Sequence, residues 1–362
     1  MYLKKITVTN FKNIPDAHII FSPKINCITG INGSGKTNLL DAVYYLSMTK
    51  SFFSTIDHLS IMYDSDCTSL NGEYARDDSG VENISLSFNS KGEKLLKRNS
   101  RNYTRFSDHI GLIPVVMVSP SDTSLINDSG DERRKFINAI LSQIDKEYLR
   151  RLQNYNQILI QRNRLLKDDI IQEYLLGVFN EQLSANASYI FKKRVEFVEM
   201  LVPLVKEYYN LLSGEREDVD IEYRSDLNEG SLIDILGRTL EKDKHLGYTS
   251  SGVQRDDLIF CMKGHPIKRG GSQGQQKSFL IALKLAQFAV MKNIHGVSPI
   301  LLLDDLFDKL DMLRVEQLLR LVSSDFFGQI FITDSNKVRI SNILDEIDGE
   351  SLSFEIENGV VR

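Results

Sequence analysis

Eight consecutive residues near the start of the chain have the types and spacing of a phosphate-binding loop. Gly30–Thr37 reads GINGSGKT and matches the pattern G-x-x-x-x-G-K-[ST] without a gap. The glycines permit a tight turn whose backbone N–H groups converge on a phosphate, and a following helix N-terminus adds positive potential. Lys36 is expected to reach the β- and γ-phosphates, and the Thr37 hydroxyl to ligate Mg²⁺. The predicted ATP-binding residues are Gly30, Asn32, Gly33, Ser34, Gly35, Lys36, Thr37 and Asn38.

The loop lies between the two elements that such a motif requires. Ile25–Thr29 has the apolar composition of a short buried strand, and Asn38–Ser47 carries apolar residues at helical spacing. A glycine-rich turn before an ordinary helix is the alternative interpretation. Because a strand precedes the loop and a helix follows it, the pattern favours a site for ATP with Mg²⁺ as the metal cofactor.

A pair of adjacent carboxylates ends a second apolar strand. Ile300–Leu303 reads ILLL and is followed by Asp304 and Asp305. A buried strand of a parallel sheet delivers its last residues to the edge where α/β proteins bind nucleotides. Asp304 can then hold Mg²⁺ through water, and Asp305 can orient or deprotonate the attacking water, although a solvated acidic turn is the alternative. The predicted catalytic residues are Lys36, Asp304 and Asp305, and the predicted metal ligands are Thr37 and Asp304.

A third segment carries the chemistry of a helix N-terminus. Ser272–Gln275 reads SQGQ and precedes an apolar helix, so a hydroxyl and a glycine meet the positive end of the helix dipole. Such an end suits a terminal phosphate, although Ser272 also fits the role of an ordinary N-cap. The segment lies between the phosphate loop and the acidic strand end, and in that position it resembles the signature sequence of ABC ATPases.

The signature of ABC ATPases completes the nucleotide site of a partner subunit. The resemblance therefore implies an ATP-dependent homodimer in which ATP is held between two chains. The contacts in trans are expected from Ser272, Gln273, Gly274 and Gln275. Asp308–Asp311, which follows the acidic pair, resembles the D-loop of the same class.

The remaining sequence predicts strands towards both ends and helices in the middle. Residues 60–118 alternate in the manner of strands, whereas 131–213 carries apolar helical faces with almost no Gly or Pro, enough for two or three long helices. Beyond residue 272, helices and strands alternate, which favours a largely parallel sheet with helices packed on it. We therefore expect an α/β protein with a helical insertion.

Motifs along nearly the whole chain resemble the RecF family of bacterial recombination-repair ATPases, which are related to SMC proteins. The phosphate loop is widely shared, but the SQGQQ signature, an Arg-Asp-Asp run upstream of it and a double aspartate in place of Asp-Glu are more specific. The matching segments are Leu3, Thr9–Asn13, Asn38–Ala42, Ser119–Asp122, Glu132–Phe136, Arg255–Asp257, Ser272–Lys277 and Leu303–Asp305.

This resemblance implies an ABC-type, SMC-like ATPase head with a mixed or parallel sheet and an inserted, mainly helical arm domain. We expect the head at residues 1–125 and 246–362, and the arm at 126–245. The family implies weak ATP hydrolysis and sequence-independent binding of duplex DNA near single-strand/double-strand junctions. It further implies RecR as a partner, and RecO as the companion mediator, in loading a recombinase at gaps.

The chain departs from related patterns at three places. Gly252–Gln254 precedes Arg255 where the family favours Gly-Pro-His, and Phe52–Ser54 stands where a basic residue is usual. Thr333-Asp334 replaces the histidine that a transporter ATPase carries after the corresponding strand. In addition, the side chain of Asp305 is one methylene shorter than the usual Glu, which predicts slow turnover.

A run of basic residues is the candidate DNA surface. Six cations lie between residues 91 and 105, with Tyr103 and Phe106 among or beside them, and such side chains can contact phosphates. A solvated hairpin is the alternative, because charge runs usually face water. The predicted DNA contacts are Lys94, Lys97, Arg98 and Arg101.

Composition excludes other classes of function. Among the 362 residues, 42% are hydrophobic and 26% charged, as in ordinary globular proteins. Three scattered cysteines and six isolated histidines predict neither a disulfide framework nor a zinc site. Without a secretory leader or an apolar run of about 20 residues, we expect a soluble cytoplasmic protein with no membrane partner. The net charge of −5 lowers the expectation of nucleic-acid binding without excluding it.

Two other functions compete with the family interpretation. An ABC transporter ATPase subunit is expected to carry an LSGGQ signature and a Q-loop glutamine, whereas this chain has SQGQQ at 272–276 and Ser119–Asp122 in the corresponding region. A scaffold that binds ATP and scarcely hydrolyses it is disfavoured by the intact Lys36, Thr37 and aspartate pair.

Overall fold

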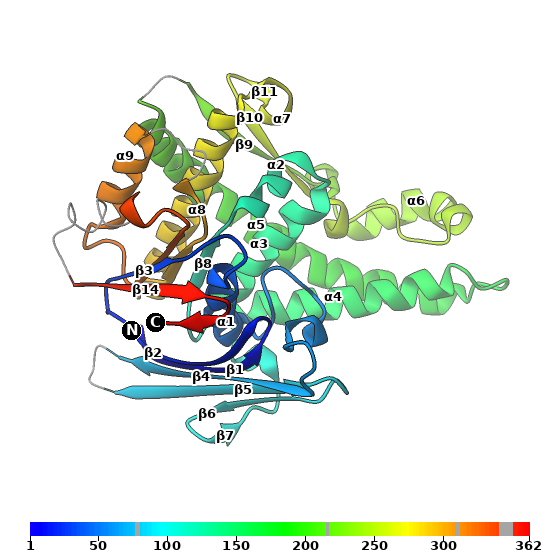
Figure 1. The fold of residues 1–362 in the computed structure, drawn as a ribbon. Helices are drawn as coiled ribbons and strands as arrows, with labels where there is room; N and C mark the ends of the chain where they lie inside the picture. Colours follow the sequence, from blue (N-terminus) through cyan, green and yellow to red (C-terminus); the bar gives the residue numbers. More distant parts are fainter. Residues whose placement is uncertain (77–79, 215–216, 308–311, 340–349) are drawn as a thin grey trace. The chain divides into compact units, whose positions relative to one another are not determined.

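The computed structural model describes residues 1–76, 80–214, 217–307, 312–339 and 350–362 (Figure 1). The chain forms two compact units. Unit 1 comprises Met1–Asp122, Leu211–Gly214 and Lys284–Arg362, and unit 2 comprises Thr123–Asn210 and Glu215–Leu283. Unit 2 therefore continues beyond residue 245, the predicted end of the helical arm, and the domain bounds expected from the sequence stay a prediction.

A mainly parallel sheet forms the centre of unit 1. Its strand order is β15-β14-β3-β13-β12-β8, and among the strand pairs of the described residues only β14–β15 is antiparallel. Every residue of β3, β8, β12 and β13 is buried, as expected where both faces of a parallel sheet are covered. The strands are β3 (Ile25–Thr29), β8 (Val115–Val118), β12 (Ile300–Leu303), β13 (Ile330–Asp334), β14 (Ser351–Glu357) and β15 (Val360–Val361).

A second, antiparallel sheet completes unit 1. Its order is β2-β1-β4-β5-β6-β7, and buried positions alternate along β4 and β5 because one face of each strand meets the core. Helix α1 (Lys36–Met48) contacts strands of both sheets, so the helix that follows the phosphate loop is held from two sides. The strands are β1 (Tyr2–Phe11), β2 (Ile14–Ile20), β4 (Cys67–Ala75), β5 (Val81–Asn89), β6 (Lys94–Arg98) and β7 (Arg101–Asn102).

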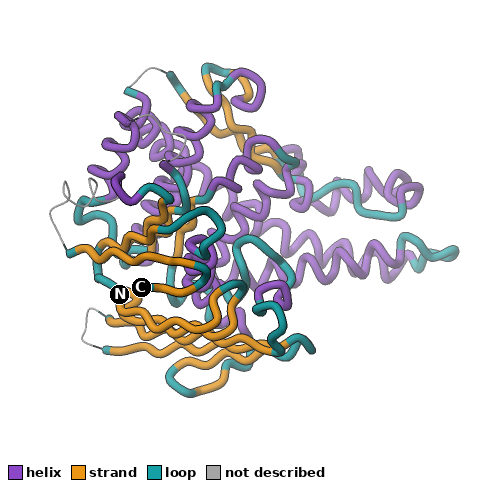
Figure 2. The backbone as a smooth tube through the Cα atoms, in the orientation of Figure 1, coloured by secondary structure: helices purple, strands orange, loops and turns teal. Residues whose placement is uncertain are grey.

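Unit 2 is largely helical, with a small antiparallel sheet of order β11-β10-β9 (Figure 2). The stretch expected to hold two or three long helices contains three, α3 (Gly130–Ile144), α4 (Lys146–Leu165) and α5 (Glu173–Ser213). The other elements are α2 (Ser124–Asn127), β9 (Val219–Arg224), α6 (Leu232–Leu246), β10 (Asp257–Met262), β11 (His265–Pro266) and α7 (Ile267–Gly270).

Among the described residues, two further helices and five short 3-10 turns are present. Helix α8 (Gln273–His295) begins in unit 2 and ends in unit 1, and α9 (Met312–Val322) belongs to unit 1. Within the described residues, no helix has the length and apolarity needed to cross a membrane. The 3-10 turns are η1 (Asp57–Ser60), η2 (Phe106–Asp108), η3 (Pro120–Thr123), η4 (Asp226–Glu229) and η5 (Val253–Arg255).

A buried ion pair ties the helices of unit 2 together. The side chains of Arg162 on α4 and Asp243 on α6 are wholly inaccessible to solvent, and their charged atoms lie 2.9 Å apart. Arg162 also donates to Thr249 Oγ1 at 2.7 Å and to Asn180 Oδ1, on α5, at 2.7 Å. Because a buried charge is tolerated only with such partners, this guanidinium fixes three helices against one another.

Removing the carboxylate of this pair should destabilise unit 2 strongly. Asp243→Ala leaves the Arg162 guanidinium buried without a counter-charge, and we expect a loss of about 3–5 kcal/mol in the free energy of unfolding. Glu241→Ala is the matched control, since it removes an exposed pair with Lys244 on the same helix and should change little. Urea unfolding followed by circular dichroism measures both, and equal effects of the two variants would contradict this assignment.

Candidate nucleotide site

The phosphate loop connects the end of β3 to the start of α1 in unit 1. Lys36 is the first residue of α1, and Gly35 before it has a φ of +120°, a conformation that side chains disfavour. A Cβ at Gly35 would lie 2.8 Å from the side-chain oxygen of Asn13, and one at Gly30 would lie 2.3 Å from the carbonyl oxygen of Ile356. Gly30 and Gly35 are thus required by conformation and also by lack of space.

The ammonium of Lys36 lies inside the loop that precedes it. Lys36 is buried, and its Nζ donates to the carbonyl oxygens of Gly30 at 2.8 Å and of Ile31 at 3.2 Å. The positive charge is therefore held within the ring of the loop backbone. The residues predicted from the motif all lie in this loop or in the first turn of α1, namely Gly30, Asn32, Gly33, Ser34, Gly35, Lys36, Thr37 and Asn38.

The structure brings the phosphate loop and the acidic strand end together. Thr37 Oγ1 donates to the carboxylate of Asp304, with distances of 2.9 Å to Oδ1 and 3.1 Å to Oδ2. Asp304 directly follows β12 and is 3% exposed. Burial raises the pKa of Asp304 above its ordinary 3.8, and the hydrogen bonds from Thr333 and Thr37 oppose that shift. Two predicted metal ligands are therefore in direct contact.

Thr333 is a site residue whose role the sequence pattern did not indicate. Its hydroxyl donates to Asp304 Oδ1 at 2.9 Å and accepts the backbone N–H of Asp305 at 2.9 Å. Asp305 has a φ of +41°, in the left-handed region that non-glycine residues rarely adopt. The one available signal was a polar residue near the end of a neighbouring buried strand, β13. Thr333 joins the two carboxylate residues, and the predicted D-loop at 308–311 lies outside the described residues.

The predicted signature belongs to unit 2 and forms a reciprocal helix cap. The N–H of Ser272 donates to Gln275 Oε1 at 2.6 Å, and the N–H of Gln275 donates to Ser272 Oγ at 3.3 Å. Gln275 Nε2 also donates to Glu217 Oε1 at 2.9 Å. The segment therefore starts α8 with an ordered cap, and Ser272 and Gln273 remain exposed.

Phe52 and Phe53, the aromatic residues after α1, form cation–π contacts with lysines from other segments of unit 1. The Nζ of Lys284 lies 5.5 Å from the centre of the Phe52 ring, and that of Lys12 lies 5.3 Å from the centre of the Phe53 ring. Asp41 accepts the backbone N–H of Phe52 at 2.8 Å. These two departures from the family pattern are thus integrated into the packing of unit 1.

Lys94, one of the four predicted DNA contacts, is an internal residue. Its Nζ donates to the Thr49 carbonyl at 2.6 Å, to Asp57 Oδ2 at 2.8 Å and to the Tyr45 hydroxyl at 3.1 Å. Burial lowers the pKa of Lys94, and Asp57 opposes that shift. Because its ammonium is paired with Asp57 and its side chain is 13% exposed, Lys94 is engaged within unit 1, and its predicted contact with DNA stays a prediction.

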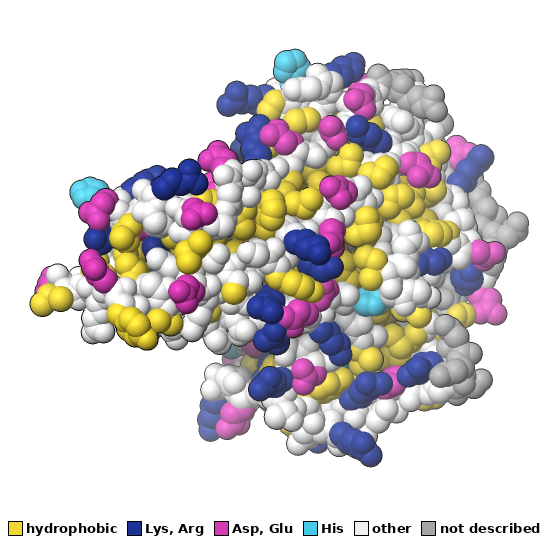
Figure 3. All heavy atoms as spheres, turned by 180° about the vertical axis from the view of Figure 1, so that it is seen from behind, with side chains coloured by type: hydrophobic (Ala, Val, Ile, Leu, Met, Phe, Trp, Pro, Cys, Tyr) yellow, Lys and Arg dark blue, Asp and Glu magenta, His cyan; other side chains and the backbone are white. Residues whose placement is uncertain are grey.

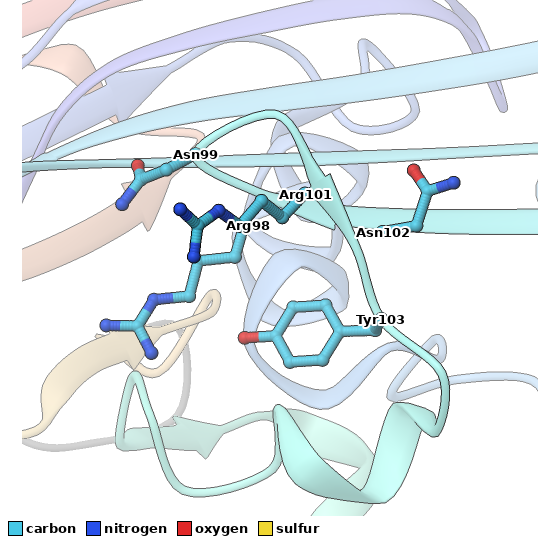
Figure 4. A pocket seen from close by; sticks show the side chains of 5 residues that line it. All are labelled: Arg98, Asn99, Arg101, Asn102 and Tyr103. Carbon is cyan, nitrogen blue, oxygen red and sulfur yellow. The ribbon is translucent and has the colours of Figure 1, made fainter.

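The other predicted contacts lie at the β6–β7 hairpin. Arg98 donates to both carboxylate oxygens of Glu82, at 2.8 Å and 2.6 Å, so its charge is also paired. Lys97 is half-buried and Arg101 is exposed. Arg98, Asn99, Arg101, Asn102 and Tyr103 line an open cleft of about 500 Å³. Figure 4 shows their side chains. On the face drawn in Figure 3, Lys and Arg alternate with Asp and Glu rather than forming one basic stripe.

Comparison with known proteins defines the class of this fold and site. The family model RecF/RecN/SMC N terminal domain matches residues 2–351. The Smc head domain from Pyrococcus furiosus has the same fold, with a TM-score of 0.58 at 16% identity, over 100% of this chain and 95% of that one. The predicted α/β, SMC-like ATPase head fold is confirmed.

Closer relatives give the family. The DNA replication and repair protein RecF of Phocaeicola vulgatus is 46% identical over 363 residues, which cover 100% of this chain and 98% of the relative. That of Parabacteroides distasonis is 46% identical, covering 100% and 99%. A structure of the recombination mediator protein RecF with ATP superposes with a TM-score of 0.90 at 30% identity, covering 100% and 97%. The chain belongs to the RecF family of DNA replication and repair proteins.

The ion pair between Arg98, in the β6–β7 hairpin, and Glu82 should make the free energy of unfolding depend on pH. Arg98, together with Arg76 and Asn99, holds the pKa of Glu82 at about 2, below its ordinary 4.5. A lowered pKa in the folded protein means that the pair stabilises fully above pH 4.5, and that this stability is lost as the pH falls towards 2. We therefore expect wild type to exceed Glu82→Gln in unfolding free energy at neutral pH, with the difference shrinking below pH 4.5.

Chemical unfolding at pH 7, 5, 4 and 3.5 measures this difference. Arg98→Met serves as the control, because with only Arg76 and Asn99 left beside the carboxylate a subsequent Glu82→Gln change should have a smaller pH-dependent effect. A difference between wild type and Glu82→Gln that stays constant from pH 7 to 3.5 would contradict the assigned pair.

Proposed function

We propose that the chain is an ATP-dependent DNA-binding protein of recombinational repair with weak ATPase activity. The observation that carries the proposal is the contact of Thr37, at the start of α1, with Asp304, at the end of β12, in a chain of the RecF family. These two segments bring a phosphate-binding loop and a pair of carboxylates to one edge of a buried sheet, which is the arrangement that nucleotide hydrolysis requires.

The proposed roles follow from the donor types. Lys36 contacts the β- and γ-phosphates, and Asp305 orients or deprotonates the attacking water. A hydroxyl and a carboxylate 2.9 Å apart are the hard oxygen ligands that Mg²⁺ takes, so Thr37 and Asp304 would hold the ion, which neutralises charge on the phosphates when bound. The relative whose structure contains ATP, at 30% identity, supports the same nucleotide here.

The signature supports an ATP-gated homodimer. Ser272 and Gln273 are exposed at the N-terminus of the 23-residue helix α8, where backbone N–H groups and the helix dipole favour an anion. We propose that Ser272, Gln273, Gly274 and Gln275 contact the ATP of a second copy. Hydrolysis then separates the two copies and acts as a timing step in the cytoplasm.

DNA is proposed to bind as a duplex with a nearby single-stranded gap, through its backbone. Lys97 and Arg101 remain the candidate phosphate contacts, since Lys94 and Arg98 are engaged by Asp57 and Glu82. A related RecF is described as a recombination mediator protein of the RecFOR pathway. On that basis we propose RecR and RecO as partners of this chain in loading a recombinase at gaps.

Two substitutions separate chemistry from nucleotide binding. Asp305→Asn removes the base and should lower the ATPase turnover about 100-fold without weakening ATP binding. Thr333→Val removes the hydroxyl between the two aspartates and should lower turnover about tenfold, whereas Thr333→Ser retains the hydroxyl and should restore it. Phosphate release measures turnover, and fluorescence of a labelled ATP measures affinity.

The wild-type turnover itself is a test. We expect it to lie below the roughly 10 s⁻¹ typical of enzymes, because Asp305 is shorter than glutamate and holds the water less well. A faster wild type, or full activity of Asp305→Asn, would contradict the assigned base.

DNA binding should require ATP and both halves of its site. Anisotropy of a labelled gapped duplex should report tight binding with ATP and weak binding with ADP or without nucleotide. Lys36→Ala removes the phosphate contact, and Ser272→Arg places a bulky cation at the signature, so each should abolish the effect of ATP. Equal binding in all three nucleotide states would separate DNA binding from the nucleotide and refute the gated dimer.

The contribution of the hairpin can be measured in the same assay. Replacing Lys97 and Arg101 together by Ala should weaken binding and reduce the slope of log affinity against log salt by about 2 per bound copy, and so by about 4 for the proposed dimer. Replacing Lys135 and Lys192, two exposed lysines of unit 2, is the charge-matched control and should leave the slope unchanged. Equal slopes for both double variants would exclude the hairpin.

A further inference from the structure

The last strands of the chain form a hairpin that contacts the phosphate loop. This clamp hairpin, residues Ser351–Val361, consists of β14, a turn at Asn358-Gly359, and β15. Strand β14 pairs in parallel with β3, the strand that leads into the phosphate loop, along Ser351–Glu355 (Figure 1). At the end of the pairing, Thr29 Oγ1 donates to the Phe354 carbonyl at 3.2 Å. Strands β14 and β3 are therefore paired up to Thr29, the residue directly before the phosphate loop.

The turn of the clamp hairpin reaches one particular carbonyl of the loop. The backbone N–H of Gly359 donates to the carbonyl oxygen of Ser34 at 2.8 Å. The side chain of Asn13 donates to the same oxygen at 3.1 Å, and its Oδ1 accepts from Asn38 Nδ2 at 2.7 Å. The Ser34 carbonyl thus has two donors, one from each of two segments that lie far from the loop in the sequence.

Fixing this carbonyl also fixes the neighbouring N–H group. In a planar trans peptide the carbonyl of one residue and the N–H of the next point in opposite directions. Holding the Ser34 oxygen on the side of Asn13 and Gly359 therefore directs the N–H of Gly35 to the opposite side. Gly35 N–H is one of the backbone donors that a phosphate loop presents to its anion.

We propose that the clamp hairpin and Asn13 are positioning elements of the nucleotide site, which set the orientation of the Ser34–Gly35 peptide before nucleotide binds. This inference rests on the proposed ATP site. Asn13 and Gly359 act through the loop backbone and do not contact the nucleotide in this role. A preformed loop loses less conformational freedom on binding, and its affinity for phosphate is correspondingly higher.

Close packing explains why the turn carries glycine. Gly359 has a φ of +81°, follows Asn358 with a φ of +49°, and makes the Asn-Gly turn typical of two-residue hairpins. A Cβ at Gly359 would lie 1.9 Å from the backbone oxygen of Asn13, so any other residue must push the turn away. Gly92, in the β5–β6 hairpin, has a similar φ of +86° but no heavy atom within 4 Å of an added Cβ.

This pair of glycines gives a matched test. Gly359→Ala and Gly92→Ala place alanine at a similarly unfavourable φ, but only the first displaces its turn from Asn13. We expect Gly359→Ala to weaken the binding of a fluorescent ATP analogue about tenfold or more, and Gly92→Ala to leave it within about twofold. Asn13→Ala, which removes one donor to Ser34 without altering the hairpin, should weaken binding in the same direction if Gly359→Ala fails to fold.

Hydrogen exchange of residues 30–38 without nucleotide supplies a readout that is independent of ATP. Exchange should be faster than wild type in Gly359→Ala and Asn13→Ala, and unchanged in Gly92→Ala. If wild type binds the analogue and neither clamp variant alters affinity or exchange, the inference is overturned while the ATP site stands. If wild type does not bind the analogue, the proposed function fails, and the exchange measurement alone decides whether the hairpin orders the loop.

Discussion

A carboxylate buried at the end of an apolar strand needs hydrogen-bond donors, and Asp304 obtains them from two distant segments. Thr37 lies 267 positions before it and Thr333 lies 29 positions after it. The three side chains meet because β3, β13 and β12 are successive neighbours in one parallel sheet and end at the same edge. The hydrogen bonds to Asp304 therefore depend on the strand order and on the start of α1 at the end of the phosphate loop that follows β3. The rest of the site is arranged around these hydrogen bonds.

The glycines of the phosphate loop meet two different physical requirements. Gly30 and Gly35 leave no room for a Cβ, because the Ile356 carbonyl and the Asn13 side chain press against them from outside the loop. Gly33 has a φ of +81° and no heavy atom near an added Cβ, so conformation alone accounts for glycine there. The loop is crowded at Gly30 and Gly35, on the side of the clamp hairpin and Asn13, and open at Gly33, at its exposed tip. This asymmetry suits a loop whose backbone is supported by the protein on one side and contacted by a ligand on the other.

Local patterns predicted the elements of the site well, because strands β3, β12 and β13 are short apolar runs and α1 has helical spacing next to an unmistakable loop. Hydrogen-bond and ion-pair partners could not be predicted where they depend on whether a side chain points into the protein or towards solvent. Lys94 belongs to a charged run that reads as solvent-exposed, yet it turns inward to Asp57 and the end of α1. In the sequence, Thr333 was noted only as standing where a transporter ATPase carries a histidine. Its contact with Asp304 could not be predicted, because a single sequence does not show that β13 lies between β3 and β12. The extent of unit 2 to Leu283 depends on tertiary packing, which a single sequence does not show.

The pairing of the hairpin cations also bears on how DNA would be held. Two of the four predicted contacts are neutralised within the protein, and each phosphate contact contributes only one counterion to the binding equilibrium. A single copy that offers DNA two hairpin cations, Lys97 and Arg101, on a chain of net charge −5, should bind DNA weakly at physiological salt. In the proposed dimer, two copies joined by ATP would present the same residues twice, so that the second engagement would become intramolecular and the combined affinity would rise steeply without any new contact. On the proposed function, weak hairpins are therefore an advantage: DNA affinity then depends on the dimer, and through the dimer on whether ATP has yet been hydrolysed.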